Sequence, residues 1–277
     1  MRNPKTDPFF SFANLDNSEM QLAMGALLIA QGEYPELNIE AYLRQLDEMA
    51  DAVREQIQAT TLPEQHIAEL NRYLFEEKGF TGNIDNYYAL GNNFLNIVLE
   101  QKTGIPITLA VVYIEVGRRA GLPLVGINFP GHFLVKYRLE HLDILLDVFE
   151  NGMLMTEDTL RSKLQANFEE SVSLAPSMLA EATDKEILAR ILRNLTRAYT
   201  LLEKYDKAVT AAERIMWLLP EATGDYRTLG YLYYKNHAYH KSITAFETYL
   251  QLAKEPPDAA AVERNIQQLQ KLLSRLN

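Results

Sequence analysis

The 277-residue chain contains no cysteine and only one tryptophan. The absence of cysteine excludes disulfide bonds, thiolate metal ligands and a thiol nucleophile, and it fits a reducing compartment. Long apolar runs are also missing. The stretch over residues 22–30 is far too short to cross a bilayer, and the first residues are polar or proline rather than the apolar core of a signal peptide. We therefore expect a cytoplasmic protein without a membrane segment.

Charge is distributed unevenly. The net charge is −10, yet the region from Asp184 onward carries 14 Lys and Arg against 11 Asp and Glu, a net of +3. The preceding region carries 13 positive and 26 negative side chains, a net of −13. An acidic domain of this kind repels the phosphate backbone, so we expect no nucleic-acid partner.

Helical periodicity dominates the first hundred residues. The Ser-x-x-Gln pattern at Ser18 predicts a capping box that opens a helix ending before Gly32. Apolar residues at spacings of three and four predict a second helix over residues 39–58, and Pro63 is typical of the first turn of a third.

The pattern changes after a further predicted helix at 105–120. Short runs rich in β-branched and aromatic residues follow at 124–129, 132–137 and 144–148, with turn residues between them. A helix followed by consecutive short strands predicts an antiparallel sheet packed on that helix, which is an α+β core.

From residue 184 to the end the chain is predicted to be entirely helical. Leu195 and Leu229 are 34 residues apart, as are Tyr199 and Tyr233, which is the period of tetratricopeptide repeats. Two units and a capping helix over residues 259–276 account for this region. The predicted domains are therefore residues 1–183 and residues 184–277.

Tyrosines are concentrated in the second repeat. Tyr233 occupies a core position of the repeat pattern, whereas Tyr231 and Tyr234 flank it and have no place in that core. We interpret these two as candidate peptide-binding residues, and we expect the partner to be another protein or peptide held by the repeats.

One constellation in the first domain suggests chemistry. A predicted helix start at Pro106 is followed by His132 and then by Asp147. This order resembles the transglutaminase-like core, in which a cysteine at a helix N-terminus is deprotonated by a histidine that an aspartate orients. The resemblance places His132 in the histidine role and Asp147 in the carboxylate role. It places Pro106 at the cysteine position, where no nucleophile is available.

Three interpretations of the His132–Asp147 pair remain open: a structural hydrogen bond, a retained ligand cleft, or a general base. Thr108 is the nearest hydroxyl to the vacant position and is a candidate nucleophile only if a base is aligned with it. Candidate cleft residues are Asn93, Asn96, Asn128 and Tyr113. A metal site would have to combine His132 with His141 and Asp143 or Asp147, a spacing that fits no recognised cage, so we expect neither metal nor cofactor.

The whole layout resembles the SirB-one family of bacterial transglutaminase-like proteins with tetratricopeptide repeats. The resemblance is carried by the Asn-Phe-Leu-Asn-Ile-Val-Leu sequence at 93–99, Gly-Ile-Pro-Ile at 104–107, Tyr113 and Asn-Phe-Pro-Gly-His-Phe at 128–133. It implies a non-catalytic regulatory or scaffold protein. The alternative is a cysteine-independent hydrolase or acyl transferase that uses His132 and Asp147.

Overall fold

The computed structural model describes residues 6–140, 143–167 and 172–276. It divides into two compact units, one formed by residues 16–191 and the other by the described parts of 1–15 and 192–277. The boundary between them falls within helix α8 (Asp184–Leu201). Within the described ranges, no helix is both long enough and apolar enough to cross a membrane.

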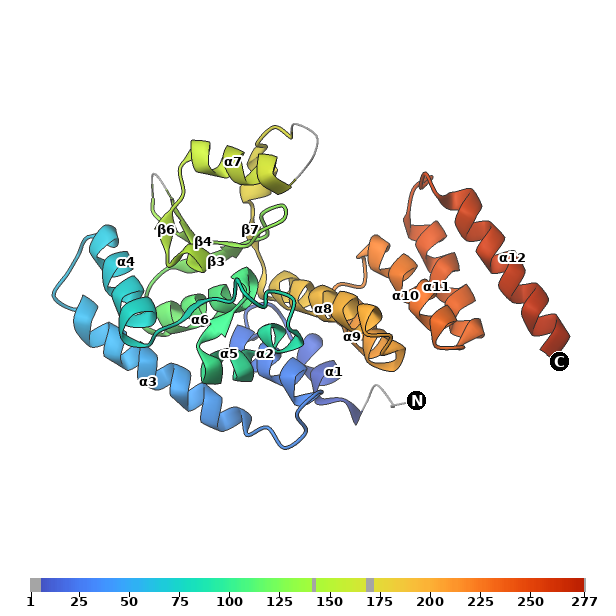
Figure 1. Cartoon of the computed structure of the whole chain (residues 1–277), viewed down its shortest axis with the longest axis horizontal. Coiled ribbons are helices and arrows are strands. Elements are labelled where there is room, and N and C mark those ends of the chain that lie inside the picture. Colours follow the sequence, from blue (N-terminus) through green and yellow to red (C-terminus); the bar gives the residue numbers. More distant parts are fainter. Residues whose placement is uncertain (1–5, 141–142, 168–171, 277) are drawn as a thin grey trace. The chain divides into compact units, whose positions relative to one another are not determined.

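The first unit begins with a layer of helices that surrounds α6 (Figure 1). Amphipathic α3 contacts α6 along the stripe predicted from the sequence, with Leu46, Ala50 and Val53 fully buried. The central helix is α6 (Pro106–Arg119), and the surrounding helices are α2 (Leu22–Gln31), α3 (Ile39–Ile57), α4 (Pro63–Asn71), a π-helical continuation η2 (Arg72–Glu77), a 3₁₀ turn η3 (Leu90–Asn93) and α5 (Leu95–Gln101).

The predicted capping box at Ser18 is wrong. Helix α2 starts at Leu22, and its N-cap Gln21 makes no side-chain capping hydrogen bond. The residues before it form a separate turn, in which the amides of Glu19 and Met20 both donate to the carbonyl of Asp16. Because the N-cap is Gln21, Ser18 lies three residues before the position that a capping-box serine occupies.

The predicted α+β core is confirmed. A five-stranded antiparallel sheet has the order β6-β5-β4-β3-β7, and β3 and β4 pack on α6. Gly117 of α6 allows this close packing, because a Cβ atom there would lie 2.2 Å from a methyl group of Leu124. The strands are β3 (Leu124–Ile127), β4 (Leu134–Tyr137), β5 (Ile144–Asp147), β6 (Met153–Leu154) and β7 (Glu181–Ala182), while β1 (Thr81–Gly82) and β2 (Thr103–Gly104) form a separate parallel pair.

Helix α7 (Glu157–Asn167) lies over one face of the sheet. Its residues Leu160 and Leu164 are buried in a cluster with Ile127, Phe129 and Leu134 of the β3–β4 hairpin. The sheet is therefore covered on both faces near the point where β3 turns into β4.

The second unit consists of helical hairpins. Gly230 lets α10 approach α11 closely, since a Cβ atom there would lie 2.6 Å from the ring of Phe246, and the Ser242 hydroxyl donates to the Gly230 carbonyl at 2.7 Å. The helices that follow α8 are α9 (Tyr205–Leu218), α10 (Thr223–Lys235), α11 (Tyr239–Leu252) and α12 (Ala259–Leu276). A short helix α1 (Pro8–Ala13), which the sequence pattern did not predict, contacts α9.

Candidate functional site

The histidine of the predicted constellation is presented by the loop between β3 and β4. Gly131 has a left-handed φ of +70°, which a residue with a side chain adopts only at a cost, and the His132 amide then closes the turn by donating to the Phe129 carbonyl at 3.1 Å. Arg190 of α8 fixes the same loop by donating to the carbonyls of His132 at 2.7 Å and Phe129 at 3.3 Å. The backbone of the β3–β4 loop is thus held by its own turn hydrogen bond and by Arg190.

The structure brings His132 and Asp147 together. The Nε2 atom of His132 lies 2.9 Å from both carboxylate oxygens of Asp147, which is at the end of β5 and is fully buried. Lys163 of α7 adds an ion pair at 2.7 Å, and the Phe149 amide donates to the same carboxylate at 3.1 Å. A buried carboxylate with this many donors is fully satisfied.

The ionisation of Asp147 follows from these contacts. Burial raises the pKa of the carboxyl, but the hydrogen bond and charge of His132 and the ion pair with Lys163 outweigh burial and hold the pKa below its ordinary value. An ionised carboxylate only accepts, so Nε2 of His132 must carry the proton. Within the described residues Nδ1 of His132 makes no hydrogen bond.

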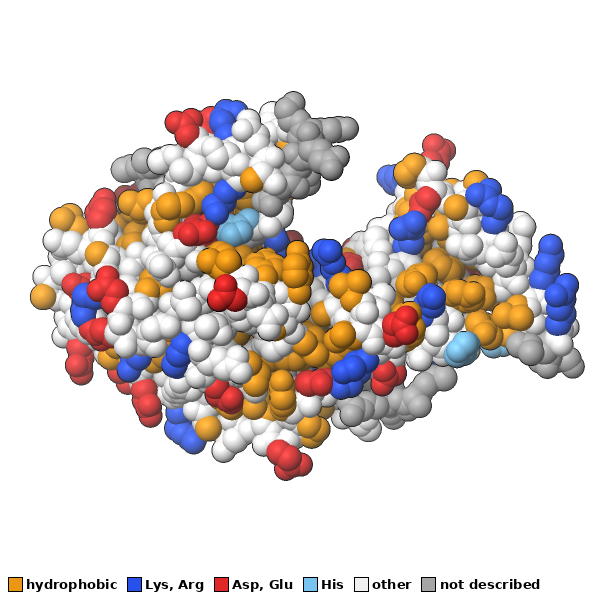
Figure 2. All heavy atoms as spheres, in the orientation of Figure 1, with side chains coloured by type: hydrophobic (Ala, Val, Ile, Leu, Met, Phe, Trp, Pro, Cys, Tyr) orange, Lys and Arg blue, Asp and Glu red, His pale blue; other side chains and the backbone are white. Residues whose placement is uncertain are grey.

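Aromatic side chains border the histidine. The Phe149 ring meets the His132 ring edge to face at 6.3 Å, Tyr87 meets Phe149 at 6.0 Å, and Tyr88 is largely exposed beside Tyr87. Figure 2 shows a histidine next to a patch of hydrophobic side chains on this unit. The side-chain Nδ2 of Asn92 donates to the carbonyls of Asn86 and Tyr87, so Asn92 holds the loop that carries the two tyrosines.

The hydroxyl of Thr108 serves the start of α6. It accepts from the Ile105 amide at 3.2 Å and donates to the Asn92 carbonyl at 2.8 Å, and the side chain is buried. Pro106 is the first residue of the helix. The threonine therefore acts as a capping group that also links α6 to η3 through Asn92. None of its hydrogen bonds among the described residues reaches His132.

The four candidate cleft residues are not gathered in one place. Asn128 accepts from Arg190 at 3.4 Å and so belongs to the His132 loop, whereas Tyr113 is fully buried and donates to Asn71 at 2.9 Å. Asn93 and Asn96 are buried in the η3–α5 region, and the side-chain oxygen of each lacks a hydrogen-bond partner among the described groups.

The residues of the metal alternative are engaged elsewhere or fall outside the described ranges. Asp143 pairs with Lys136 at 3.1 Å and accepts from the Leu139 amide, while His141 lies outside the described residues. No cluster of three metal-ligating side chains is found within the described part of the chain.

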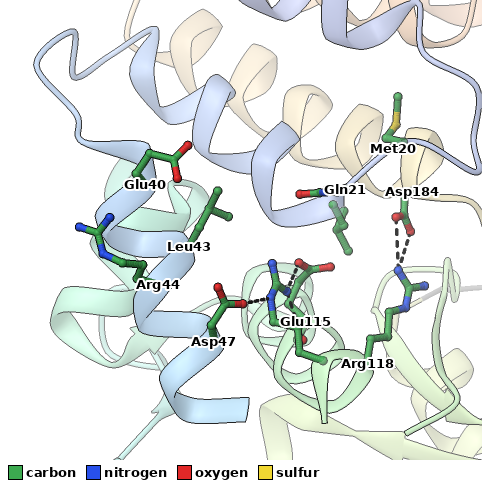
Figure 3. Close-up of a pocket in the computed structure, with 11 residues that line it drawn as sticks. Met20, Gln21, Glu40, Leu43, Arg44, Asp47, Glu115, Arg118 and Asp184 are labelled. Atoms are coloured by element: carbon green, nitrogen blue, oxygen red, sulfur yellow. Dashed lines mark hydrogen bonds and ion pairs between the residues drawn. The ribbon is translucent and has the colours of Figure 1, made fainter. Parts of the chain in front are cut away.

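A separate pocket of about 540 Å³ lies between α2, α3 and α6 in the same unit (Figure 3). Part of its charged lining is internally paired: Arg118 binds Asp184 at 3.0 Å, and Arg119 binds Asp47 at 2.8 Å as well as Glu115.

In the repeat unit, the two tyrosines singled out from the sequence are at the surface. Tyr231 and Tyr234 are 43% and 47% exposed, whereas Tyr233 between them is buried and donates to Glu213. Lys235 lies over the rings of Tyr231 at 5.8 Å and Tyr205 at 5.7 Å. The exposed side of α10 therefore carries aromatic groups and a cation.

Comparison with known sequences agrees with both units. The pattern of the transglutaminase-like superfamily matches residues 40–193, and a tetratricopeptide repeat pattern matches residues 195–267. The chain belongs to the transglutaminase-like superfamily. This match, together with the repeats, confirms the predicted layout.

Several relatives that match over most of the chain are bacterial proteins. A UPF0162 protein of Xylella fastidiosa is 35% identical over 87% of each chain, and one of Pseudomonas aeruginosa is 31% identical over 75% of this chain and 76% of its own. Protein SirB1 of Salmonella typhimurium is 22% identical over 92% of this chain and 95% of its own. The predicted likeness to the SirB-one family is thereby confirmed.

Sequence reasoning missed Lys163 and Arg190, which hold the His132–Asp147 pair in place. Both lie on predicted helices outside the strand region, Lys163 on the helix that follows the strands and Arg190 58 residues after His132. Nothing in their local patterns distinguishes them from other basic residues of a solvated helix face.

Proposed function

We propose that this protein is a non-catalytic regulatory or scaffold protein that mediates protein–protein interaction through its repeat unit. The single observation that carries the proposal is the exposed pair Tyr231 and Tyr234 on α10. Tetratricopeptide repeats generally mediate protein interactions, and tyrosine contributes large contact area at low entropic cost.

The geometry of α10 supports a binding role for this face. Leu229, Leu232 and Tyr233 satisfy the packing of the helix, so the two exposed tyrosines are not needed for its core. Lys235 adds a positive charge beside Tyr231. A partner segment that places an apolar or acidic side chain here would cover surface that is otherwise left in water.

In this proposal the transglutaminase-like unit serves as a platform. Its helix start has proline where the thiol chemistry of the superfamily needs a cysteine, and its buried carboxylate is shared between a histidine and a lysine. An ion pair that links three segments is well suited to fixing their positions.

The proposal is tested by photo-crosslinking from the full-length chain in its native cells. A crosslinking amino acid is placed at Tyr231 or Tyr234 and, as a matched control, at Tyr88, which is 82% exposed on the other unit. We expect the same partner to be captured from both repeat positions and not from position 88. Capture from position 88 alone would assign the interaction to the transglutaminase-like unit instead.

A second candidate function is a cysteine-independent hydrolase or acyl transferase. The observation in its favour is that Asp147 orients His132 through Nε2, while Nδ1 has no hydrogen-bond partner among the described groups, which is the arrangement of a general base. The test is amidase and esterase activity of purified wild-type and His132→Ala chains. Activity that is lost in a folded His132→Ala variant would support catalysis, and equal activity in both would end this candidate.

A further inference from the structure

The N-terminal segment of the repeat unit has the properties of a bound peptide. Helix α1 has six residues, fewer than an isolated helix needs to be stable in water. It begins with Asp7 as N-cap, whose side chain accepts from the Phe9 amide at 3.0 Å, and with Pro8 in the first turn. The segment therefore depends on contacts with α9 (Figure 1) for its order.

A buried ion pair anchors this segment. Two nitrogens of the Arg214 guanidinium on α9 make three hydrogen-bond contacts to the Asp7 carboxylate, with Nε at 3.1 Å and Nη2 at 2.9 Å from Oδ2, and Nη2 at 3.0 Å from Oδ1. Both side chains are more than nine-tenths buried. Bidentate pairs of this kind are directional, and burial makes them sensitive to loss of either partner.

Aromatic contacts accompany the ion pair. The Phe9 ring is fully buried and lies 5.1 Å beneath the Arg214 guanidinium. Phe10 meets the ring of Trp217 edge to face at 5.2 Å and 89°. Arginine and tryptophan on one side with aromatic side chains on the other are the residue types that dominate binding hot spots.

Side chains, and not backbone hydrogen bonds, attach α1 to α9. The backbone hydrogen bonds around α1 are local, from Phe10 to Asp7 and from Leu15 to Phe12. The connection that follows, residues 14–19, is exposed apart from the half-buried Leu15. Among the described residues, no backbone hydrogen bond joins this segment to α9, so side-chain contacts alone attach it there.

We propose that the face of α9 bearing Arg214 and Trp217 is a peptide-binding site that residues 7–13 fill in cis. Its ligand class is a short helical segment of a partner protein in which a carboxylate at the helix start is followed by aromatic side chains. Such a segment displaces the chain's own N-terminus. This site is distinct from the Tyr231–Tyr234 face and does not depend on it.

The binding arm uses a fluorescein-labelled synthetic peptide of residues 6–15 and full-length chains. In the Asp7→Asn chain the cis segment loses its ion pair and competes less, so we expect the peptide to bind at least tenfold more tightly than to the wild-type chain. Binding also changes the emission of Trp217, the only tryptophan. A Ser11→Ala peptide, altered at an exposed position, binds equally well, and an Asp7→Asn peptide loses binding.

The exchange arm uses the unmodified wild-type chain, so it does not depend on the folding of any variant. We expect the amides of residues 9–13 to exchange with deuterium at least tenfold faster than those in the middle of α9, because the segment opens locally. Alanine at Tyr231 and Tyr234 leaves both arms unchanged, which separates this site from the proposed function.

Two results overturn the proposed site, and a third overturns its ligand class. The first is the absence of saturable peptide binding to the Asp7→Asn chain up to about 1 mM, the weakest affinity of interest. The second is exchange of residues 9–13 that is as slow as that of α9, which would make the segment a permanent part of the fold. The third is a wild-type chain that dimerises and an Asp7→Asn chain that does not. This result would mean that the α9 site binds a second copy of this chain and not a different partner protein.

Discussion

Helices α6 and α10 illustrate two ways in which a helix is used in this molecule. Every residue of α6 from Pro106 to Gly117 is buried, and its start is closed by the Thr108 hydroxyl. In α10 only Leu229, Gly230, Leu232 and Tyr233 are buried, and tyrosines remain in water on the other side. A helix buried all round serves the core, whereas a helix with one buried side leaves surface for a partner.

The comparison has consequences for substitutions. The Asp147 carboxylate and the Thr108 hydroxyl are buried and paired, so their loss leaves unsatisfied partners in the interior. Exposed groups on α10 have water as an alternative partner, so their loss changes binding rather than stability.

The largest effect is expected from Asp147→Asn. Removal of the charge leaves Lys163 and the His132 proton without their carboxylate, and breaking a buried pair of this kind costs about 3–5 kcal/mol. Urea denaturation followed by circular dichroism measures the loss. The matched control is Asp143→Asn on the same sheet, where the carboxylate is 37% exposed and the expected cost is under about 1 kcal/mol.

The same pair predicts a pH dependence. Since the folded-state pKa of Asp147 is depressed, its stabilising contribution is present above the unfolded-chain value of about 3.9 and is lost as pH falls through the folded value. The difference in unfolding free energy between wild type and Asp147→Asn should therefore be constant at neutral pH and shrink below about pH 4. A difference that grows on acidification would contradict this assignment.

A smaller loss is expected from Thr108→Val. The methyl group fills the same volume but leaves the Ile105 amide and the Asn92 carbonyl without their buried partner, at a cost of about 1–3 kcal/mol. Thr196→Val is the control, since its hydroxyl donates only to the Leu192 carbonyl four residues before it in α8 and the cost should be under about 1 kcal/mol. Equal losses in the two variants would argue against the capping role.

Gly230→Ala should destabilise the repeat unit by about 1–2 kcal/mol. The new methyl group would lie 2.6 Å from the Phe246 ring, and this overpacking exceeds the gain in helix propensity. In the same helix, a Cβ atom at Gly224 meets nothing within 4 Å, so Gly224→Ala should be neutral or slightly stabilising. Thermal unfolding monitored through Trp217 emission distinguishes the two.

The smallest effect on stability is expected from Tyr231→Ala combined with Tyr234→Ala. Both side chains are about half exposed and lie outside the core of the helix, so the free energy of unfolding should change by less than about 0.5 kcal/mol per site. Recovery of the crosslinked partner should nevertheless be lost. A large loss of stability would place these tyrosines in the packing of the unit rather than at a binding surface.

Much of this fold could be predicted from sequence, because strong periodic signals coincide with strong burial. The 34-residue spacing of Leu195 and Leu229 and the apolar stripe of α3 each determine one arrangement of helices. The change to short β-rich runs after Gly121 likewise predicted the sheet. The Ser-x-x-Gln pattern at Ser18 also occurs in turns, and the start of α2 that it predicted was wrong.

The candidate site was harder to predict. The order of His132 and Asp147 indicated that they would meet, since adjacent antiparallel strands bring such positions together. Lys163 and Arg190 join them only through tertiary packing. In the same way, the pairing of Asp7 with Arg214, 207 positions away, has no local signal in the sequence.

The carboxylate of Asp147 has a consequence for how the molecule opens. It is the common acceptor for the β3–β4 loop through His132, for α7 through Lys163 and for the turn after β5 through Phe149. Three segments that are separate along the chain thus share one junction. Fluctuations that free one of them weaken the other two, so this end of the sheet should open as a single cooperative piece instead of fraying strand by strand.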